Sequence, residues 1–550
     1  MAIVAIKRGR GLNKEAIRIG LLLNRSGQRP WQCRLAEEIA QDDRFVLSQV
    51  LRIADGLADS HINQSTAWQS KMASKLLGLI EAAERGIFVP TNLSEGAKTC
   101  QALSQAQATE LAFNTSLDAS AISAISRLDI IISLVPISKQ VAHGLASHAS
   151  LWAIAAGDGE DISDPHFGFW DMFNNNGISR LALLEVSADG TALLAEGNLR
   201  KQFCYALNKC FLLEKSVALI LRELRRWVWD ANTGRAAPLP YIRPSRKSLK
   251  TSSVFAYLLR LAANLAPKIY KMVLKKTGRR YNQWSLFVGS GKFAAQHMSK
   301  ACETQPPANE VWADPFLFRP DGSSQVHVFF ENYEFAKRRG KISVGGLHNN
   351  KVEYIGDALV GQNHLSYPFV FSYDGEIYMV PESGENRQIE IWKAIDYPLG
   401  WVLHKAVMQS QSCADTTIFE HKGDWWMFTN ISNDPFEDHC SELHIFKVDS
   451  PMLNEIEPHA LNPVIMDART ARNAGRITVR DGKLTRLAQN NAYHYGYGFS
   501  LMEIEKLSLQ EYGERCLYSV EPGFVRGITS THHLDHLDGV YIFDGLREFG

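Results

Sequence analysis

The sequence predicts an open α/β domain followed by an all-β five-bladed propeller. Two observations predict this: strands alternate with helices in the first 200 residues, and one strand–turn–strand pattern occurs five times in the second half. The turn glycines of that pattern, at positions 322, 375, 423, 482 and 539, lie 48–59 residues apart. Such a period is typical of propeller blades. We expect an α/β domain over 1–235, a basic helical linker over 236–280 and the propeller over 281–550.

Composition excludes several classes of protein. The chain has 550 residues, a formal net charge of zero and 45% hydrophobic residues, so it is globular and too long for one core. A neutral chain gives no electrostatic reason to bind nucleic acid. Its eight cysteines form no CxxC pair, which predicts reduced thiols and no zinc site.

The first domain opens with a continuous apolar run, Ile17 to Leu23, that is typical of a buried parallel strand. A helix is expected over 32–41 and further strands over 45–51 and 128–134. Alternating strands and helices favour a sheet whose ligands lie beyond the carboxyl ends of its strands. Residues 24–27 contain no GxGxxG, so we expect no dinucleotide and no other cofactor.

From Leu128 onward the chain resembles the catalytic domain of formyltransferases. The resemblance rests on Gly157-Asp158, Phe167-Gly168-Phe169-Trp170-Asp171 and Asp189-Gly190. It implies an Asn, a His and an Asp that converge on the formyl carbon. Asp189 would match the aspartate and His148 lies nearby, but Ala153–Ala156 occupies the stretch expected to hold the histidine. The alternative is a retained fold that serves as a scaffold or binding half.

Residues 201–229 have the apolar spacing of a helix, and prolines at 238, 240 and 244 then end the first domain. Residues 241–281 contain eleven Lys or Arg and no Asp or Glu, interleaved with apolar stretches. A basic amphipathic helix there could lie on an anionic membrane surface, or it could pack on its own domains with solvated lysines. The first ten residues lack a signal-peptide core, and no apolar run is long enough to span a membrane. We therefore expect a cytoplasmic protein that could bind the inner membrane face.

In a propeller, the first strand of each blade runs along the central axis, and equivalent residues ring the channel mouth. Residues eight positions before each turn glycine should form this ring: Asp314, Tyr367, Asp415, Ala474 and Thr531. The second strands return to the same mouth and end near Glu331, Glu382, Asn430, Gln489 and Asp544. Several carboxylates should therefore gather at one end of the channel.

Paired carboxylates are what glycosidic-bond chemistry requires, since one protonates the leaving oxygen and another acts as base or nucleophile. The candidate catalytic residues are Asp314, Asp415, Glu382 and Glu331. The candidate substrate-binding residues are Trp312, His364, Tyr367, Asn430, Arg472, Asn473, Gln489 and His532, because aromatic rings and amides contact sugar faces and hydroxyls. The structural alternative is that the aspartates cap strand-end amides and the histidines are ordinary hydrogen-bonding groups. No metal is expected.

Two further resemblances concern the propeller. Trp312-Ala313-Asp314-Pro315-Phe316 is similar to the first-blade motif of five-bladed family 43 glycoside hydrolases, which implies an Asp in blade one, an Asp in blade three and a Glu in blade four. Asp314 and Asp415 match the first two. Blade four has Arg472 instead, so either Glu382 or Glu331 replaces the acid or the reaction is not simple hydrolysis.

The stretches 363–371 and 378–382 resemble the N-terminal region of plant glucosamine inositolphosphorylceramide transferase, a likeness that spans about 300–550. Together these features favour a carbohydrate-active enzyme that transfers or hydrolyses a glycosidic linkage of a sugar or glycolipid. Two alternatives stay open: a non-catalytic glycan- or glycolipid-binding protein, and formyl or acyl transfer to an amino sugar by the first domain.

Overall fold

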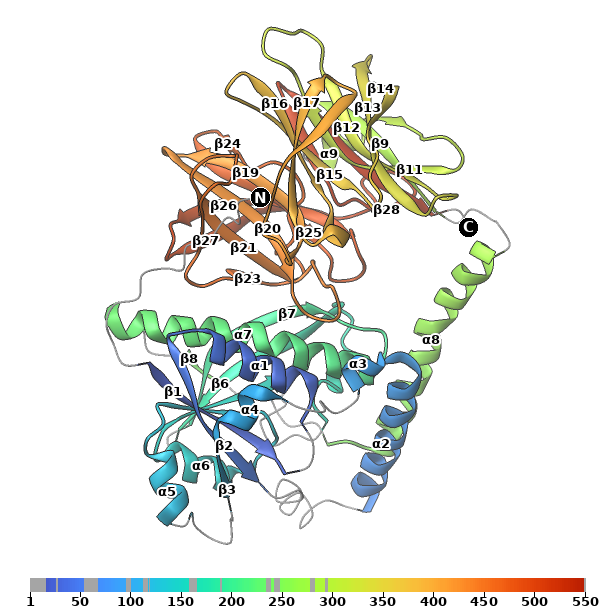
Figure 1. Ribbon diagram of the computed structural model, residues 1–550. Coiled ribbons are helices and arrows are strands. Elements are labelled where there is room, and N and C mark those ends of the chain that lie inside the picture. The colour runs from blue at the N-terminus through green and yellow to red at the C-terminus, as the bar shows by residue number, and fades with distance from the viewer. Residues whose placement is uncertain are drawn as a thin grey trace. The chain divides into compact units, whose positions relative to one another are not determined.

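The structure is a computed structural model. It describes residues 16–25, 28–53, 68–94, 100–111, 117, 119–157, 166–187, 190–233, 239–241, 248–276, 282–291 and 295–548. The chain divides between Lys268 and Ile269 into two compact units, which are described separately below (Figure 1).

The first unit is built on an eight-stranded sheet with the order β3-β2-β1-β4-β5-β6-β7-β8. Its strands are β1 (Ile17–Asn24), β2 (Phe45–Ile53), β3 (Gln107–Leu111), β4 (Ile130–Ser133), β5 (Ser150–Ala156), β6 (Ile178–Val186), β7 (Thr191–Arg200) and β8 (Leu239–Pro240). The first five strands pair in parallel, whereas β5 to β8 are antiparallel. The three strands predicted from apolar runs are all present, so the expectation of an α/β domain is confirmed.

Helices accompany this sheet. They are α1 (Pro30–Gln41), α2 (Trp68–Phe88), α3 (Thr91–Ser94), α4 (Gln101–Gln105), α5 (Ala119–Ile125), α6 (Lys139–Ala146), the 3-10 helix η2 (Trp170–Phe173), α7 (Tyr205–Thr233) and α8 (Thr251–Lys276). α1 and α7 correspond to the helices predicted over 32–41 and 201–229.

The first unit extends beyond the boundary expected at residue 235. β8 pairs with β7, and Leu249, Val254 and Tyr257 are buried in a cluster of this unit. The expected linker over 236–280 therefore consists of a sheet strand and the helix α8. Apolar residues on one face of α8 explain the difference, because they are buried in the hydrophobic core of the first unit.

The strand order reverses between β1 and β4, which is where an open α/β sheet offers a ligand crevice. Ala153–Ala156 forms the end of β5. Asp158 and Asp189, which carry the formyltransferase resemblance, lie outside the described residues, so that assignment stays a prediction.

The second unit is a five-bladed propeller, as predicted. Blade one contains β11 (Glu310–Phe318), β12 (His327–Glu334), β13 (Arg339–His348) and β14 (Lys351–Leu359), and blade two contains β15 (Ser366–Tyr373), β16 (Glu376–Glu382), β17 (Ile389–Asp396) and β18 (Gly400–Val407). Blade three contains β19 (Ser412–His421), β20 (Asp424–Ser432), β21 (Glu442–Val448), β22 (Ile456–Pro458) and β23 (Ile465–Met466). Blade four contains β24 (Thr478–Arg480), β25 (Lys483–Asn490), β26 (Gly498–Leu507) and β27 (Tyr512–Val520). Short helices α9 (Ala295–Met298) and η3 (Gly384–Asn386) complete the unit.

Two-residue turns join the two inner strands in four of the blades. Both turn residues have positive φ in each case: Asp374-Gly375, Lys422-Gly423, Asp481-Gly482 and Asp538-Gly539. Two consecutive left-handed residues define the hairpin turn that matches strand twist. The glycines therefore fix each hairpin, as the sequence pattern predicted.

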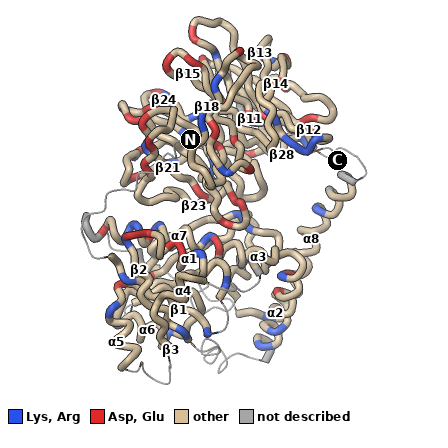
Figure 2. The backbone as a smooth tube through the Cα atoms, viewed as in Figure 1, with Lys and Arg blue, Asp and Glu red and all other residues tan. Residues whose placement is uncertain are grey.

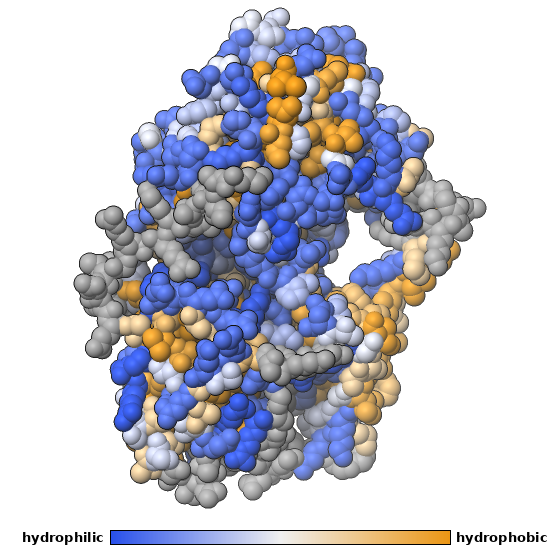
Figure 3. Space-filling model, in the orientation of Figure 1, coloured by the Kyte–Doolittle hydropathy of each residue, from blue (hydrophilic) through white to orange (hydrophobic). Residues whose placement is uncertain are grey.

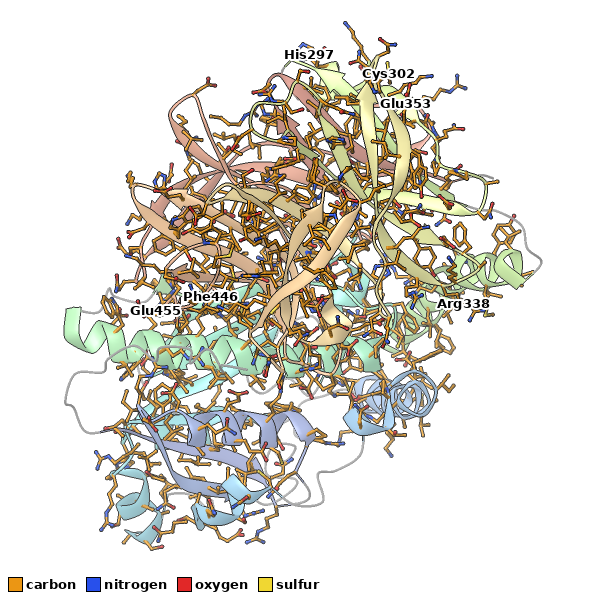
Figure 4. All side chains as sticks on the ribbon, turned by 45° about the horizontal axis from the view of Figure 1, so that its top comes forward. His297, Cys302, Arg338, Glu353, Phe446 and Glu455 are labelled. Carbon is orange, nitrogen blue, oxygen red and sulfur yellow. The ribbon has the colours of Figure 1, made fainter. Side chains whose placement is uncertain are left out.

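The fifth blade is closed by a strand from the start of the unit. β9 (Asn282–Ser290) pairs with the C-terminal β30 (Val540–Glu548), flanked by β10 (Cys302–Thr304), β28 (Ile528–Ser530) and β29 (Leu534–Leu537). The Val352 backbone N–H of β14 donates to Thr304 Oγ1 of β10 at 3.1 Å, which joins the fifth blade to the first. In Figure 4, Cys302 and Glu353 of these two blades lie close together, and Phe446 of the third blade lies on another side.

Among the residues that the structure describes, no helix combines the length and the apolar character needed to span a bilayer.

Candidate active site at the propeller axis

The innermost strands of the first three blades share an unusual backbone feature. Asp314, Tyr367 and Asp415 have φ of 48°, 44° and 48°, in the left-handed region that non-glycine residues rarely adopt. In each strand a bulge interrupts the pairing at this residue. Such a bulge redirects a side chain out of the regular alternation. Three of the five residues predicted to be equivalent therefore occupy the same strained position, whereas Ala474 and Thr531 do not have positive φ.

The neighbouring strand of each blade adds a polar residue at a fixed register. Glu331 is paired with Ala313, Glu382 with Ser366 and Asn430 with Ala414, in each case one residue before the left-handed position. The second strands thus present two carboxyl groups and one amide at equivalent positions beside the axis. This confirms the predicted register of these second-strand ends.

Asp544 organises one half of the site. Its carboxylate accepts backbone N–H groups from Asp314 at 3.1 Å, His532 at 2.9 Å and His533 at 3.1 Å. His532 Nδ1 lies 2.7 Å from the same carboxylate, and His532 Nε2 lies 3.5 Å from Asp314 Oδ1. The fifth blade therefore supplies a carboxylate–imidazole pair that faces the aspartate of the first blade.

Burial and neighbouring charges set the ionisation of this half. Burial raises the pKa of Asp314 to about 7, opposed by His532 and reinforced by Asp415 and Asp544. Burial would lower the pKa of His532, but Asp544 and Asp314 outweigh it and raise the pKa to about 9. Burial lowers the pKa of His533 to about 3. At neutral pH a cationic His532 thus lies between two carboxyl groups, beside a neutral His533.

Glu331 is another carboxyl group of this half whose pKa is raised. Burial, with additional repulsion from Asp314, raises its pKa well above the ordinary range. His364 Nε2 lies 3.3 Å from Glu331 Oε1, while His364 Nδ1 accepts the Gly340 backbone N–H at 2.9 Å. That bond places the proton of a neutral His364 on Nε2, facing Glu331. The glutamate side chain is 13% exposed, so it lies at the edge of the mouth.

Arg472 organises the other half. Its guanidinium binds Asp415 through Nε at 2.6 Å and Nη2 at 3.2 Å, and Nη2 also donates to Glu382 at 3.1 Å. Burial raises the pKa of Asp415 to about 7, opposed by Arg472. Tyr495 lies under the guanidinium, with its ring centroid 5.3 Å away. Blade four thus contributes a cation that joins two of the predicted catalytic carboxylates.

Arg476 joins the fourth blade to three other blades further along the inner strands. Arg476 forms an ion pair with Asp535 at 3.2 Å and donates to the carbonyls of Leu317 and Val370. Leu317 lies three residues beyond Asp314, roughly 10 Å along the strand. A small hollow beside this ion pair is lined by residues of the fourth and fifth blades. The Arg476–Asp535 ion pair therefore lies further along the inner strands than the carboxylates.

Several residues predicted to bind substrate have structural partners instead. Asn430, Asn473 and Gln489 are almost fully buried, and their amides bond to backbone carbonyls and to Asp415. Asn473 and Gln489 hold Asp415 in place, and Asn430 accepts the Asn473 backbone N–H. Buried amides must be hydrogen-bonded within the protein.

The same correction applies to two aromatic residues. Trp312 is 4% exposed in a hydrophobic cluster and its Nε1 donates to Glu310, so its ring cannot stack on a sugar. Tyr367 is fully buried, and its hydroxyl bonds to Gly475 and lies 3.0 Å from Thr417 Oγ1. The sequence pattern located both positions but could not show how deeply they are buried.

The remaining predicted residues form two groups near the axis, in which Asp314, Asp415 and His532 are themselves at most 5% exposed. Asp314, Glu331, His364 and His532 form one half of the site, and Asp415, Glu382 and Arg472 form the other. Sequence reasoning gave no role to Asp544, although its place at a second-strand end was a usable signal. It missed the Arg476–Asp535 ion pair, since neither residue lies at a repeat-equivalent position.

One set of these side chains also has the geometry of a metal site. Ligand atoms of Asp314, His532 and Asp544 all lie within 4.8 Å of one another and could hold an ion. Without an ion, the same three groups form a carboxylate–imidazolium–carboxylate chain with contacts of 2.7 Å and 3.5 Å. The expectation that no metal takes part stays a prediction.

Solved structures with a similar fold include three carbohydrate-active proteins. A family 117 glycoside hydrolase from Zobellia galactanivorans matches with a TM-score of 0.32 and 11% identity, covering 48% of this chain and 90% of that one. A family 43 β-xylosidase/α-arabinofuranosidase from a compost metagenome has a TM-score of 0.32 and 13% identity, covering 44% and 91%. An exo-β-1,3-galactanase from Phanerochaete chrysosporium has a TM-score of 0.32 and 10% identity, covering 49% and 64%.

Sequence comparison gives a closer likeness. Residues 295–525 match the family model described as the N-terminal part of glucosamine inositolphosphorylceramide transferase 1. The Arabidopsis thaliana protein of that name is 35% identical over 212 residues, covering 38% of this chain and 27% of its own length. The Oryza sativa subsp. japonica protein is 34% identical over 212 residues, covering 38% and 28%. The predicted resemblance to this plant region is thereby confirmed, and the match spans just over a quarter of these relatives.

Proposed function

We propose that the propeller mouth acts on a glycosidic linkage of a glycan or glycolipid. One observation carries the proposal: Asp314 and Asp415 are buried at equivalent left-handed positions, each with a pKa of about 7. Left-handed non-glycine residues cost about 1–3 kcal/mol each and cluster at functional sites. Carboxyl groups whose pKa values are raised toward neutrality suit acid–base chemistry.

Asp314 is the proposed base or nucleophile. His532 faces its carboxylate, and the cationic imidazolium favours the ionised form that a base requires. Asp544 orients the imidazole through Nδ1. In the reaction, Asp314 would take the proton of the attacking hydroxyl or attack the anomeric carbon itself.

Glu331 is the better candidate for the general acid. Its raised pKa keeps the carboxyl protonated, as donation to a leaving oxygen requires. Glu382 already accepts a hydrogen bond from Arg472, and we assign it to substrate positioning together with Asp415. The proton would pass from Glu331 to the glycosidic oxygen as the bond to the anomeric carbon breaks.

The substrate class follows from the relatives only as a proposal. Their names describe a transferase of glucosamine and inositolphosphorylceramide, so a lipid-linked glycan is the first substrate to examine. Transfer and hydrolysis differ in whether a sugar hydroxyl or water attacks. Product analysis in the presence and absence of an acceptor glycan separates the two.

The experiment compares the full chain with Asp314→Asn on a panel of free and lipid-linked glycosides, followed by mass spectrometry. A positioned acid–base group contributes about 10²–10⁴-fold, so this variant should lose at least a hundredfold in kcat. Asp321→Asn, in the exposed turn of the same blade, is the matched control and should retain activity. Equal turnover by wild type and Asp314→Asn would contradict the proposal.

A second candidate is a glycan-binding module without catalysis. The bidentate Arg472–Asp415 pair favours it, because these charges already satisfy each other. It predicts that sugar binding survives in Asp314→Asn and that no product forms with any glycoside. Calorimetric titration of both proteins with the same glycans distinguishes the candidates.

Formyl or acyl transfer to an amino sugar by the first unit is the remaining alternative. This alternative can be tested by measuring whether a folate cofactor binds to the full chain. The same measurement is made on a His148→Ala variant for comparison. His148 lies after α6 at an exposed position, so this change should preserve folding.

A further inference from the structure

One side of α2 carries exposed apolar side chains. Met72, Leu79 and Ile87 are 40%, 71% and 72% exposed. Their spacing, together with exposed Ala83, places them on one stripe of the helix. The opposite stripe, which includes Ala73 and Leu77, is buried in the first unit. α2 is therefore apolar on both its buried and its exposed sides.

α8 repeats this arrangement. Val254 and Tyr257 are buried, whereas Phe255 and Leu259 are 58% and 74% exposed. The exposed stripe continues along the same helix through Ala262 and Ala266. Scattered exposed apolar residues are ordinary, but a continuous stripe marks an interaction surface.

The two helices lie side by side (Figure 1). Val254 and Tyr257 share a hydrophobic cluster with Ala73 and Leu77, and the Tyr257 hydroxyl donates to Glu84 of α2. Apolar residues gather along both helices in Figure 3. We call the exposed residues Met72, Leu79, Ile87, Phe255 and Leu259 the α2–α8 surface.

Basic residues outnumber acidic residues on both helices. α8 contains five Lys or Arg residues and no Asp or Glu. Figure 2 colours Lys and Arg along the chain in blue. The two acidic residues of α2 are occupied: Glu81 binds Arg85 and Lys209, and Glu84 accepts from Tyr257 and the Ala206 backbone.

Exposed cations lie close to the apolar stripe. On α2, Lys71 and Lys75 are exposed beside Met72 and Leu79. The apolar stripe is thus flanked by cations, and the acidic groups of α2 are paired. This pattern complements a surface that is apolar inside and anionic outside.

We propose that the α2–α8 surface binds an anionic membrane surface, with its apolar side chains in the acyl boundary and its lysines at the headgroups. Interfacial helices bind in this way, through buried apolar area and attraction to anionic lipids. A protein partner with an apolar groove would not require cations on both helices. The proposal does not depend on the chemistry of the propeller.

The test is co-sedimentation of the full chain with vesicles of phosphatidylcholine alone, or with about 30% phosphatidylserine added. Binding is expected to the anionic vesicles at low salt and to weaken when sodium chloride rises to about 0.5 M, since salt screens surface charges. Lys71→Gln combined with Lys75→Gln should weaken binding, by about fivefold per lysine. Absence of binding to anionic vesicles at low salt would overturn the proposal.

Apolar variants separate this surface from general adhesion. Leu79→Gln and Leu259→Gln should each weaken vesicle binding about tenfold, because each removes an inserted side chain. Val479→Gln is the matched control, since Val479 is 59% exposed in the propeller and should not affect binding. Circular dichroism checks that all variants fold.

Two other outcomes would contradict membrane binding by the α2–α8 surface. If Leu79→Gln and Leu259→Gln bind anionic vesicles as tightly as wild type, the α2–α8 surface is not the contact. The second outcome has three parts: the wild type self-associates in size-exclusion chromatography, these variants abolish that association, and anionic vesicles are not bound. It would show that a second copy of the chain covers the surface. Either result overturns the proposal.

Discussion

Asp314 adopts a backbone conformation that an aspartate does not favour by itself. Its φ of 48° is maintained by the bulge in β11 and by its backbone N–H, which donates to Asp544. Pro315 follows it and has no N–H to return to the strand pairing. The strain is therefore offset by contacts from the fifth blade, and its result is a carboxylate that faces His532.

This geometry predicts a pH dependence for the proposed reaction. As a base, Asp314 must be ionised, so kcat/KM should rise with pH up to about 7 and fall at higher pH as Glu331 loses its proton. His532→Gln removes the neighbouring cation, which raises the pKa of Asp314 and moves the acidic limb to higher pH. His348→Gln, at an exposed position, should leave the profile unchanged. An unshifted limb in His532→Gln would show that the imidazolium does not control Asp314.

A stability measurement tests the same residue without substrate. The pKa of His532 is about 9 in the folded chain against an ordinary 6.5. Its stabilising contribution is therefore fully present below about pH 6.5 and is lost as the pH rises through 9. The difference in unfolding free energy between wild type and His532→Gln should shrink over that window in urea titrations, and a constant difference would contradict the assignment.

Arg472 should matter for stability as well as for the site. Arg472→Met leaves Asp415 and Glu382 buried beside each other without a cation, which is expected to cost about 3–5 kcal/mol. The matched control is Arg469→Met: its partner is Asp467, its side chain is 47% exposed, and its loss should cost less than about 1 kcal/mol. Urea unfolding at neutral pH measures both. Similar losses in the two variants would mean that the buried pair is not needed.

At the scale of elements, the sequence predicted the hairpins because their turns have a local cause. Two-residue turns with a glycine at the second position appear in four of the five blades. Counting back from the glycines at 322, 375 and 423 located Asp314, Tyr367 and Asp415. Burial was not predictable in this way. Whether an amide near the axis faces solvent or a carbonyl depends on contacts between blades, which no repeat spacing encodes.

Gly475 differs from the turn glycines because its neighbours leave no room for a side chain. A Cβ there would lie 2.0 Å from the Leu534 carbonyl oxygen, and its φ is 142°. Gly482 also has positive φ, at 74°, but a Cβ there would meet open space. Gly475→Ala should therefore cost more than about 3 kcal/mol of unfolding free energy, against about 1–2 kcal/mol for Gly482→Ala. Equal costs in thermal or urea unfolding would show that backbone conformation alone sets both.

At the scale of the whole molecule, the sequence predicted two domains but misplaced the boundary between them. The proline cluster and basic stretch suggested a linker from residue 236. In the structure, β8 and the buried face of α8 extend the first unit to Lys268. The closing strand β9 was also missed, because a single strand paired with a partner about 260 residues away leaves no local pattern.

Ring closure leads to a prediction about where the propeller can be cut. The family match covers residues 295–525 and so omits β9 and β30, which pair with each other along their whole length. Without them the first blade loses its neighbour, and Asp314 loses the Asp544 carboxylate that binds its backbone N–H.

A fragment of residues 282–548 should unfold cooperatively as a monomer. The fragment 295–525 should aggregate or unfold without a sharp transition, because unpaired strand edges and an exposed core remain. Both fragments can be compared by near-ultraviolet circular dichroism, urea titration and size-exclusion chromatography. If the fragment 295–525 is monomeric and unfolds cooperatively, the propeller does not need its closing strands.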